Sequence, residues 1–65
     1  MTGKEYHILL GLAEQLDSLE LQCRKDSEIR KKDGGINEAF YLEGKANAYH
    51  YSAEILRLKL AETNS

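Results

Sequence analysis

The helical pattern of this chain is interrupted at one place, the segment Asp33-Gly34-Gly35, and no proline occurs anywhere in its 65 residues. The cations at positions 30–32 stand directly before the break, where they suit the negative end of a helix, and glycine supplies the left-handed residue that often follows a helix. A short connection between two long helices brings them side by side in opposite directions. The sequence therefore predicts a single all-α domain over residues 1–65, folded as a two-helix antiparallel hairpin.

The first helix is expected over about residues 3–30. Thr2 and Glu5 have the spacing of a capping box, in which the two side chains satisfy backbone amides of the first turn. The apolar side chains recur at alternating steps of three and four, which places them on one face of a helix. That face comprises Leu9, Leu12, Leu16, Leu19 and Cys23, widened by Tyr6, Ile8 and Ala13. Because Asp26 and Arg30 come next in the same pattern, the apolar contact is expected to end after about residue 23.

The second helix is expected over about residues 37–62. Asn37 has a side chain that suits an N-cap, because its oxygen accepts from an amide of the first turn. Ile36, directly before it, is expected to pack against Tyr41. Residues 63–65 are expected to fray, as chain ends commonly do.

Residues 39–56, AFYLEGKANAYHYSAEIL, are apolar around most of the circumference of this helix. On a helical wheel the apolar positions form two seams, whose centres lie roughly 150° apart. The first seam comprises Ala39, Leu42, Ala46, Tyr49, Ala53, Leu56 and Leu60. The second seam comprises Tyr41, Gly44, Ala48, Tyr51, Ile55 and Leu58, with Phe40 beside it. The first helix has one apolar face and covers one seam, so the second seam is predicted to be an oligomer interface.

A second copy of the chain is the simplest cover for this second seam. A chain of 65 residues builds only a small core, and its single cysteine, Cys23, excludes an intrachain disulfide. Packing hairpins together supplies the missing apolar contact. The sequence therefore predicts a homo-oligomeric helical bundle and leaves open a dimer, a higher oligomer, or a foreign protein on the second seam.

The charge of the chain argues against nucleic acid as a partner. The chain has 9 Lys+Arg and 11 Asp+Glu, for a formal net charge of -2, whereas a protein that grips a phosphate backbone is visibly basic. In the most basic segment, residues 24–32, acids stand one turn from the cations, which favours ion pairs over phosphate contacts. The expected pairs are Glu20–Arg24, Asp26–Arg30 and Glu28–Lys32. A small DNA-binding regulator that uses Lys31 and Lys32 is therefore only the third hypothesis for function.

No run of apolar residues approaches the length of a membrane span, and the first residues do not resemble a signal peptide. A single cysteine also fits a reducing compartment. We therefore expect a cytoplasmic protein without a membrane partner.

No residue pattern in the chain is typical of a catalytic, metal or cofactor site. His50 stands four residues before Glu54 and seven after Glu43, on a polar stripe, and a hydrogen-bonded or solvated role fits that spacing better than a metal site or proton transfer. Cys23 occupies the apolar face of the first helix, which favours a buried thiol. We therefore expect no catalytic residue, no metal ligand and no cofactor, and predict that the protein is not an enzyme.

Tyr41, Lys45 and Tyr49 recur at steps of four, with Ser52 close by, in the gap between the two seams. Aromatic faces with a cation and a hydroxyl suit stacking and phosphate capture in a nucleotide pocket at a subunit junction. The opposing interpretation is that both tyrosines pack at the edge of the core while Lys45 extends to water. The pattern favours this second interpretation and keeps a small-ligand site as the alternative.

The short, acidic, proline-free hairpin with the second-helix sequence AFYLEGKANAYHYSAEIL resembles the small accessory proteins of bacteriophages and prophages of Gram-positive bacteria. The resemblance covers most of the chain and includes no diagnostic motif, so it assigns no role to any residue. It implies a protein that acts by binding another protein, as an inhibitor or as an antagonist of a defence system. Some proteins of that kind sequester nucleotide signals as oligomers. The leading hypothesis is thus a non-enzymatic, oligomeric protein that binds stoichiometrically, and a nucleotide or cyclic-nucleotide binder is the alternative.

Overall fold

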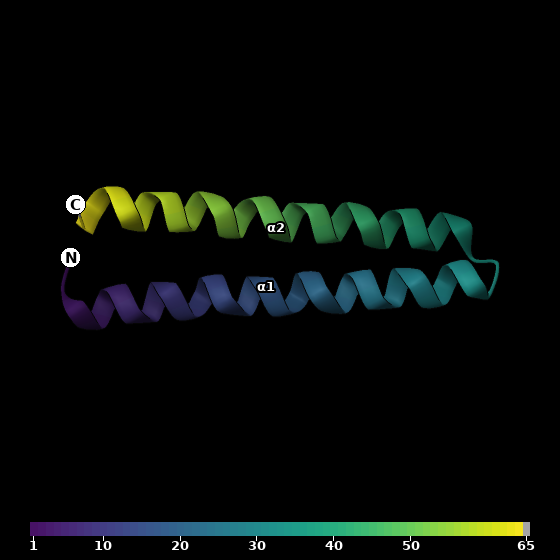
Figure 1. Cartoon of the computed structure of the whole chain (residues 1–65), viewed down its shortest axis with the longest axis horizontal. Coiled ribbons are helices and arrows are strands. Elements are labelled where there is room, and N and C mark those ends of the chain that lie inside the picture. Colours follow the sequence, from purple (N-terminus) through teal and green to yellow (C-terminus); the bar gives the residue numbers. More distant parts are fainter. Residues whose placement is uncertain (65) are drawn as a thin grey trace.

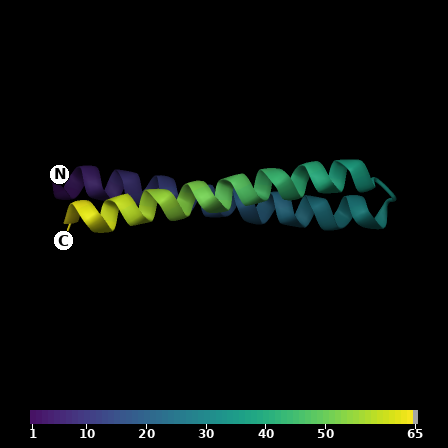
Figure 2. The same cartoon turned by 90° about the horizontal axis from the view of Figure 1, so that it is seen from above.

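The computed structural model describes residues 1–64 and contains two helices, α1 (Gly3–Lys32) and α2 (Ile36–Asn64). The helices run side by side in opposite directions, and both chain ends lie at the same end of the molecule (Figure 1). A view from above shows that they cross at a shallow angle (Figure 2). The Cα atoms extend over 48 × 16 × 10 Å, so the molecule is a thin rod. The predicted all-α antiparallel hairpin is confirmed.

The residues expected to end α1 and to begin it act largely as predicted. The hydroxyl of Thr2 accepts a hydrogen bond of 3.1 Å from the amide of Glu5, and Thr2 has the extended backbone of an N-cap. At the other end Gly34 has a φ of +86°, in the left-handed region that glycine enters without strain. The amide of Gly35 then donates to the carbonyl of Arg30 at 2.7 Å. This tight exit turns the chain directly into α2.

The predicted helix bounds are too short at three ends. α1 continues two residues beyond position 30, and α2 starts at Ile36 and continues through Asn64. Asn37 is therefore not the N-cap, because the carbonyl of Gly35 already accepts the first helical hydrogen bond, from Ala39. Ile36 is the first residue of the helix rather than the residue before its cap, and it is 48% exposed. Residues 63 and 64, which were expected to fray, are helical, while residue 65 lies outside the described residues.

The contact between the helices is built on small side chains. The first seam of α2 faces α1 as predicted, and its three central alanines at positions 39, 46 and 53 are completely or almost completely buried. Opposite them on α1, Ala13, Cys23 and Ser27 are buried as well. Small residues on both sides let the two backbones approach closely, because interaxial distance depends on the side chains at the contact.

The predicted apolar face of α1 is wrong at three positions, because Ile8, which was expected to widen it, is 62% exposed. Leu12 and Leu19 are 45% and 41% exposed, and the contact passes through Glu20 and Ser27 instead. These polar residues keep the three-four spacing with Leu16 and Cys23. The physical reason is the rotation of α1 about its axis: Ala13 and Glu20, each one residue further along, face α2, so Leu12 and Leu19 lie on the flank of the contact.

Neither α1 nor α2, over the residues described, combines the length and the apolar character that a membrane-spanning helix needs.

Candidate functional site

The side of α2 that is turned away from α1 carries the second seam, and we call it the outer face. Its members are Tyr41, Gly44, Ala48, Tyr51, Ile55 and Leu58, with Phe40 beside them. All of them are exposed in the single chain. The exposed fractions of the large side chains are 62% for Phe40, 67% for Tyr41, 61% for Tyr51, 59% for Ile55 and 62% for Leu58. The residues predicted as an oligomer interface thus lie together on one uncovered surface.

The outer face and the buried seam lie on nearly opposite sides of α2. Both seams repeat at steps of three and four, and the second is displaced from the first by two residues. That displacement is about 200° of helical rotation, or about 160° measured the shorter way round the helix. α1 therefore covers the one seam without touching the other. Apart from the adjoining residues and backbone of α2 itself, a Cβ added at Gly44 would meet no atom within 4 Å, which leaves open space above this position of the outer face.

A shallow groove lies beside the outer face, near the C-terminal end of α2, and shares only Leu58 with that face. It has a volume of about 450 Å³ and more apolar than polar lining. Its lining residues are Glu54, Arg57, Leu58 and Ala61. Leu58 and Ala61 supply the apolar part of this lining and Glu54 and Arg57 the charged part, and the apolar part suits an apolar side chain from another molecule.

One long side of the hairpin is a polar edge, in which charged side chains of α1 and α2 meet. Arg57 donates two hydrogen bonds to Asp17, at 2.6 and 3.2 Å. The Arg57 guanidinium lowers the pKa of the Asp17 carboxyl, and Asp17 raises the pKa of Arg57 in turn. Further along the same edge, Lys31 forms a salt bridge with Glu43. This bridge lowers the pKa of the Glu43 carboxyl and raises that of Lys31.

His50 lies between two carboxylates at the middle of the polar edge. Its Nδ1 is 3.2 Å from Glu20 of α1, and its Nε2 is 3.1 Å from Glu54. Arg24 also donates to Glu20, at 2.9 Å, and lowers the pKa of that carboxyl, with a smaller contribution from His50. The predicted hydrogen-bonded role of His50 is confirmed. Glu20 was not predicted as its partner, although Glu20 keeps the three-four spacing of the contact surface.

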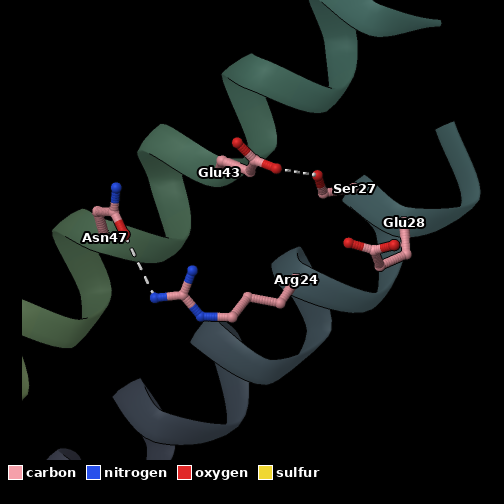
Figure 3. Close-up of a pocket in the computed structure, with 5 residues that line it drawn as sticks. All are labelled: Arg24, Ser27, Glu28, Glu43 and Asn47. Atoms are coloured by element: carbon pink, nitrogen blue, oxygen red, sulfur yellow. Dashed lines mark hydrogen bonds between the residues drawn. The ribbon is translucent and has the colours of Figure 1, made fainter. Parts of the chain in front are cut away.

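Figure 3 shows a second shallow pocket on the polar edge, of about 240 Å³. It is lined by Arg24, Ser27, Glu28, Glu43 and Asn47. Arg24 reaches across to Asn47 at 3.3 Å (Figure 3). The hydroxyl of Ser27 lies 3.1 Å from the carbonyl oxygen of Ala39 and 3.3 Å from the carboxylate of Glu43. Ser27 is only 1% exposed, so these contacts tie the two helices together and leave no hydroxyl aimed at solvent.

The structure brings together only two of the four residues predicted for a small ligand. The ammonium of Lys45 lies 5.6 Å from the ring centroid of Tyr41, a cation–π contact at the rim of the outer face. Tyr49 is half-buried on the seam that faces α1, and Ser52 is exposed. The four side chains thus follow the helix from its outer face to its inner contact, and a pocket formed by all four would need a second chain.

The basic segment at the end of α1 is largely paired within the molecule. Arg24 binds Glu20 as predicted. The other two predicted pairs are replaced, because Arg30 contacts Asp33 and Glu38 while Glu28 contacts Lys31. Cations that already have carboxylate partners are poorly placed to bind phosphates.

Cys23 is buried, as predicted. Over residues 1–64, no three side chains of His, Cys, Asp and Glu gather in an arrangement that could hold a metal ion.

No protein-family model matches this chain, and comparison with curated proteins and with solved structures finds no match either. The resemblance to small phage-encoded hairpins therefore stays a prediction from the sequence alone.

Proposed function

We propose that this chain is a non-enzymatic binding protein that self-associates through the outer face of α2 and acts stoichiometrically. One observation carries the proposal: a complete apolar seam of α2 is exposed while the opposite seam of the same helix is covered by α1. Contiguous apolar surface of this kind usually marks an interaction site, because its exposure to water is unfavourable.

Self-association through the outer face would leave apolar residues of α1 for a foreign partner. Ile8, Leu12 and Leu19 follow each other at steps of four and seven, which places them along one side of α1, and all three are exposed. In this proposal the assembled protein presents that side of α1 to a target protein, in the manner of a phage-type inhibitor or an antagonist of a host defence system.

The contact between Lys45 and Tyr41 supports a second candidate function. An aromatic ring with a cation beside it, at the rim of a self-association surface, suits a nucleotide or a cyclic-nucleotide signal held between two chains. This candidate requires the same assembly, because Tyr49 is turned toward α1 within a single chain.

Native mass spectrometry of the protein, purified gently from its expression host, tests the proposal through a matched pair of variants. Ile55→Lys places a charge in the outer face, and Leu21→Lys places the same charge on α1, where the leucine is similarly exposed, at 56%. We expect the wild type and Leu21→Lys to give dimers or higher oligomers, and Ile55→Lys to give monomers of unchanged helicity. Burial of an unpaired charge in an interface accounts for the difference.

The same spectra separate the competing functions. A monomeric wild type, or oligomers retained by Ile55→Lys, would rule out self-association through the outer face. A co-purified protein would support a stoichiometric target. A bound mass of a few hundred daltons, lost in Ile55→Lys, would place the nucleotide candidate first.

A further inference from the structure

The small and large side chains of the outer face of α2 complement each other when one copy of the face is reversed and laid on another. Its six positions follow each other at steps of three, four, three, four and three, so the spacing is the same in both directions along the helix. Near the N-terminal end the small residues Gly44 and Ala48 lie between Tyr41 and Tyr51. Near the C-terminal end only large side chains occur, namely Tyr51, Ile55 and Leu58.

We propose that two copies pack their α2 helices against each other in antiparallel orientation, about a two-fold axis that passes between Ala48 and Tyr51. This inference rests on the proposed self-association and specifies its partner geometry. Each copy then meets the other in three kinds of contact. Gly44 lies opposite Ile55, Ala48 lies opposite Tyr51, and Tyr41 lies opposite Leu58 of the second copy.

The central layers of this arrangement each combine a small residue with a large one. The open space above Gly44 receives Ile55, and the methyl group of Ala48 leaves room for the ring of Tyr51. The outer layers, with Tyr41 and Leu58, are larger on both sides. That order suits crossing helices, which are closest at the crossing point and separate toward their ends.

A parallel arrangement of the same two surfaces fits poorly. Identical residues would then face each other, so Gly44 would meet Gly44 across a void and Tyr51 would meet Tyr51 in a clash. Both voids and overpacking are unfavourable in a helix contact. The order of sizes along the outer face therefore selects the antiparallel orientation.

The residues on both flanks of the outer face agree with this register. Phe40 of one copy lies level with Lys59 of the other and close to Ala61 on the same flank, so Leu58 and Ala61 of the groove offer apolar contact to the phenylalanine ring. On the opposite flank Lys45 lies near Ser52. No pair of like charges meets along either flank, so electrostatics does not oppose the contact.

The exposed area is sufficient for a small stable interface. Five large side chains of the outer face, including Phe40, are each about 60% exposed. Each presents on the order of 100–120 Å², so a symmetric contact removes roughly 1,000–1,200 Å² from water, which reaches the lower limit of specific interfaces. A second copy of α2 thus covers the surface without any further element.

Disulfide trapping between two different single-cysteine variants tests the register. The background is Cys23→Ala, which removes the native thiol, and the new thiols are Gly44→Cys and Ile55→Cys at exposed sites. The two variants are unfolded together, refolded and oxidised mildly, and non-reducing gels report cross-links. We expect a disulfide in the mixture and none in either variant alone. In the proposed register, identical positions lie about 16 Å apart along the axis, well beyond disulfide reach.

Each other result overturns the register. Cross-links in each variant alone would show a parallel pair, and a dimeric mass without any cross-link would show contact through another surface; in both cases self-association would stand. If the Cys23→Ala background has the mass of a monomer and the helicity of the wild type, the proposed self-association is contradicted together with the register. A mixture of Gly44→Cys with Leu21→Cys, whose thiol lies on α1, is the negative control and should not cross-link.

Discussion

Glu43 connects the two helices through two different groups of α1, the ammonium of Lys31 and the hydroxyl of Ser27. The pKa of its carboxyl is lowered from the ordinary value of 4.5, mainly by Lys31. A carboxyl whose pKa is lower in the folded than in the unfolded chain stabilises the fold at pH values above its ordinary pKa. That contribution is lost as the pH falls through the folded value. Asp17 and Glu20 act in the same direction, through Arg57 and Arg24.

Glu43→Gln should therefore lower the melting temperature by a few degrees at pH 7, and the difference from the wild type should shrink as the pH falls below the ordinary pKa of the carboxyl. Glutamine keeps an oxygen that can accept from Ser27, so the variant removes only the charge. The wild type should lose stability progressively below about pH 5, as its three lowered carboxyls become protonated. Thermal unfolding followed by circular dichroism between pH 7 and pH 3 measures both effects.

A double variant serves as the control for this charge pair. Once Glu43 is a glutamine, Lys31→Gln should cost less than it does in the wild type, because the closer partner charge is already absent and only Glu28 remains. If the difference in melting temperature between the wild type and Glu43→Gln did not narrow between pH 7 and pH 3, the assignment to the carboxylate charge would be contradicted.

At the scale of the helix, α2 presents two surfaces that should respond oppositely to the same added side chain. Ala53 is 1% exposed against α1, so Ala53→Leu should overpack the hairpin and cost about 1–3 kcal/mol. Gly44→Leu is the matched control, because a Cβ there meets no atom of the same chain within 4 Å. It should stabilise the monomeric hairpin by up to about 1 kcal/mol through helix propensity.

Both substitutions should be measured in the Ile55→Lys background, in which self-association is expected to be absent. Chemical unfolding then reports the hairpin alone. In the background that self-associates, Gly44→Leu should weaken the dimer, since the leucine occupies the space that Ile55 of the second copy would fill. Equal unfolding free energies for Ala53→Leu and its parent would contradict the close alanine contact.

The two seams of α2 could be predicted from the sequence because each keeps its three-four spacing over the whole helix. The apolar face of α1 was predicted less well. Leu12 and Leu19 fit the spacing as well as the true contact residues do, although the alanines of the opposing seam were visible in the sequence. Which residues of α1 lie opposite those alanines depends on how α1 is rotated about its own axis, and periodicity alone does not give that rotation.

The candidate site was predictable to a similar extent. The exposed residues of the outer face were found as a group, since an apolar seam without a cover within the chain is visible in the pattern itself. The partner of His50 was not, because Glu20 is 30 residues away and its contact depends on how the helices are rotated about their axes. Asn37 failed as a cap for a local reason: the Gly34-Gly35 turn brings the chain into the helix one residue sooner.

At the scale of the whole molecule, the position of the outer face determines the shape of the assembly. Because this face lies nearly opposite the contact with α1, a second hairpin that packs on it extends the molecule sideways. The four helices then form a flat layer, in the order α1, α2, α2 of the second copy, and α1 of the second copy. A compact square bundle would instead require contacts between α1 of one hairpin and helices of the other.

Small-angle X-ray scattering separates these two shapes. The hairpin has a Cα radius of gyration of 14.9 Å. With helices about 10 Å apart, the centres of the two hairpins lie about 20 Å apart in the layer and about 10 Å apart in the square bundle, which gives radii of about 18 and about 16 Å. The hydration shell adds a similar increment to each species, so the increase over the monomeric Ile55→Lys variant is the quantity to compare. We expect an increase of about 3 Å at concentrations where the dimer predominates; an increase of about 1 Å with a dimeric mass would show that α1 takes part in the interface.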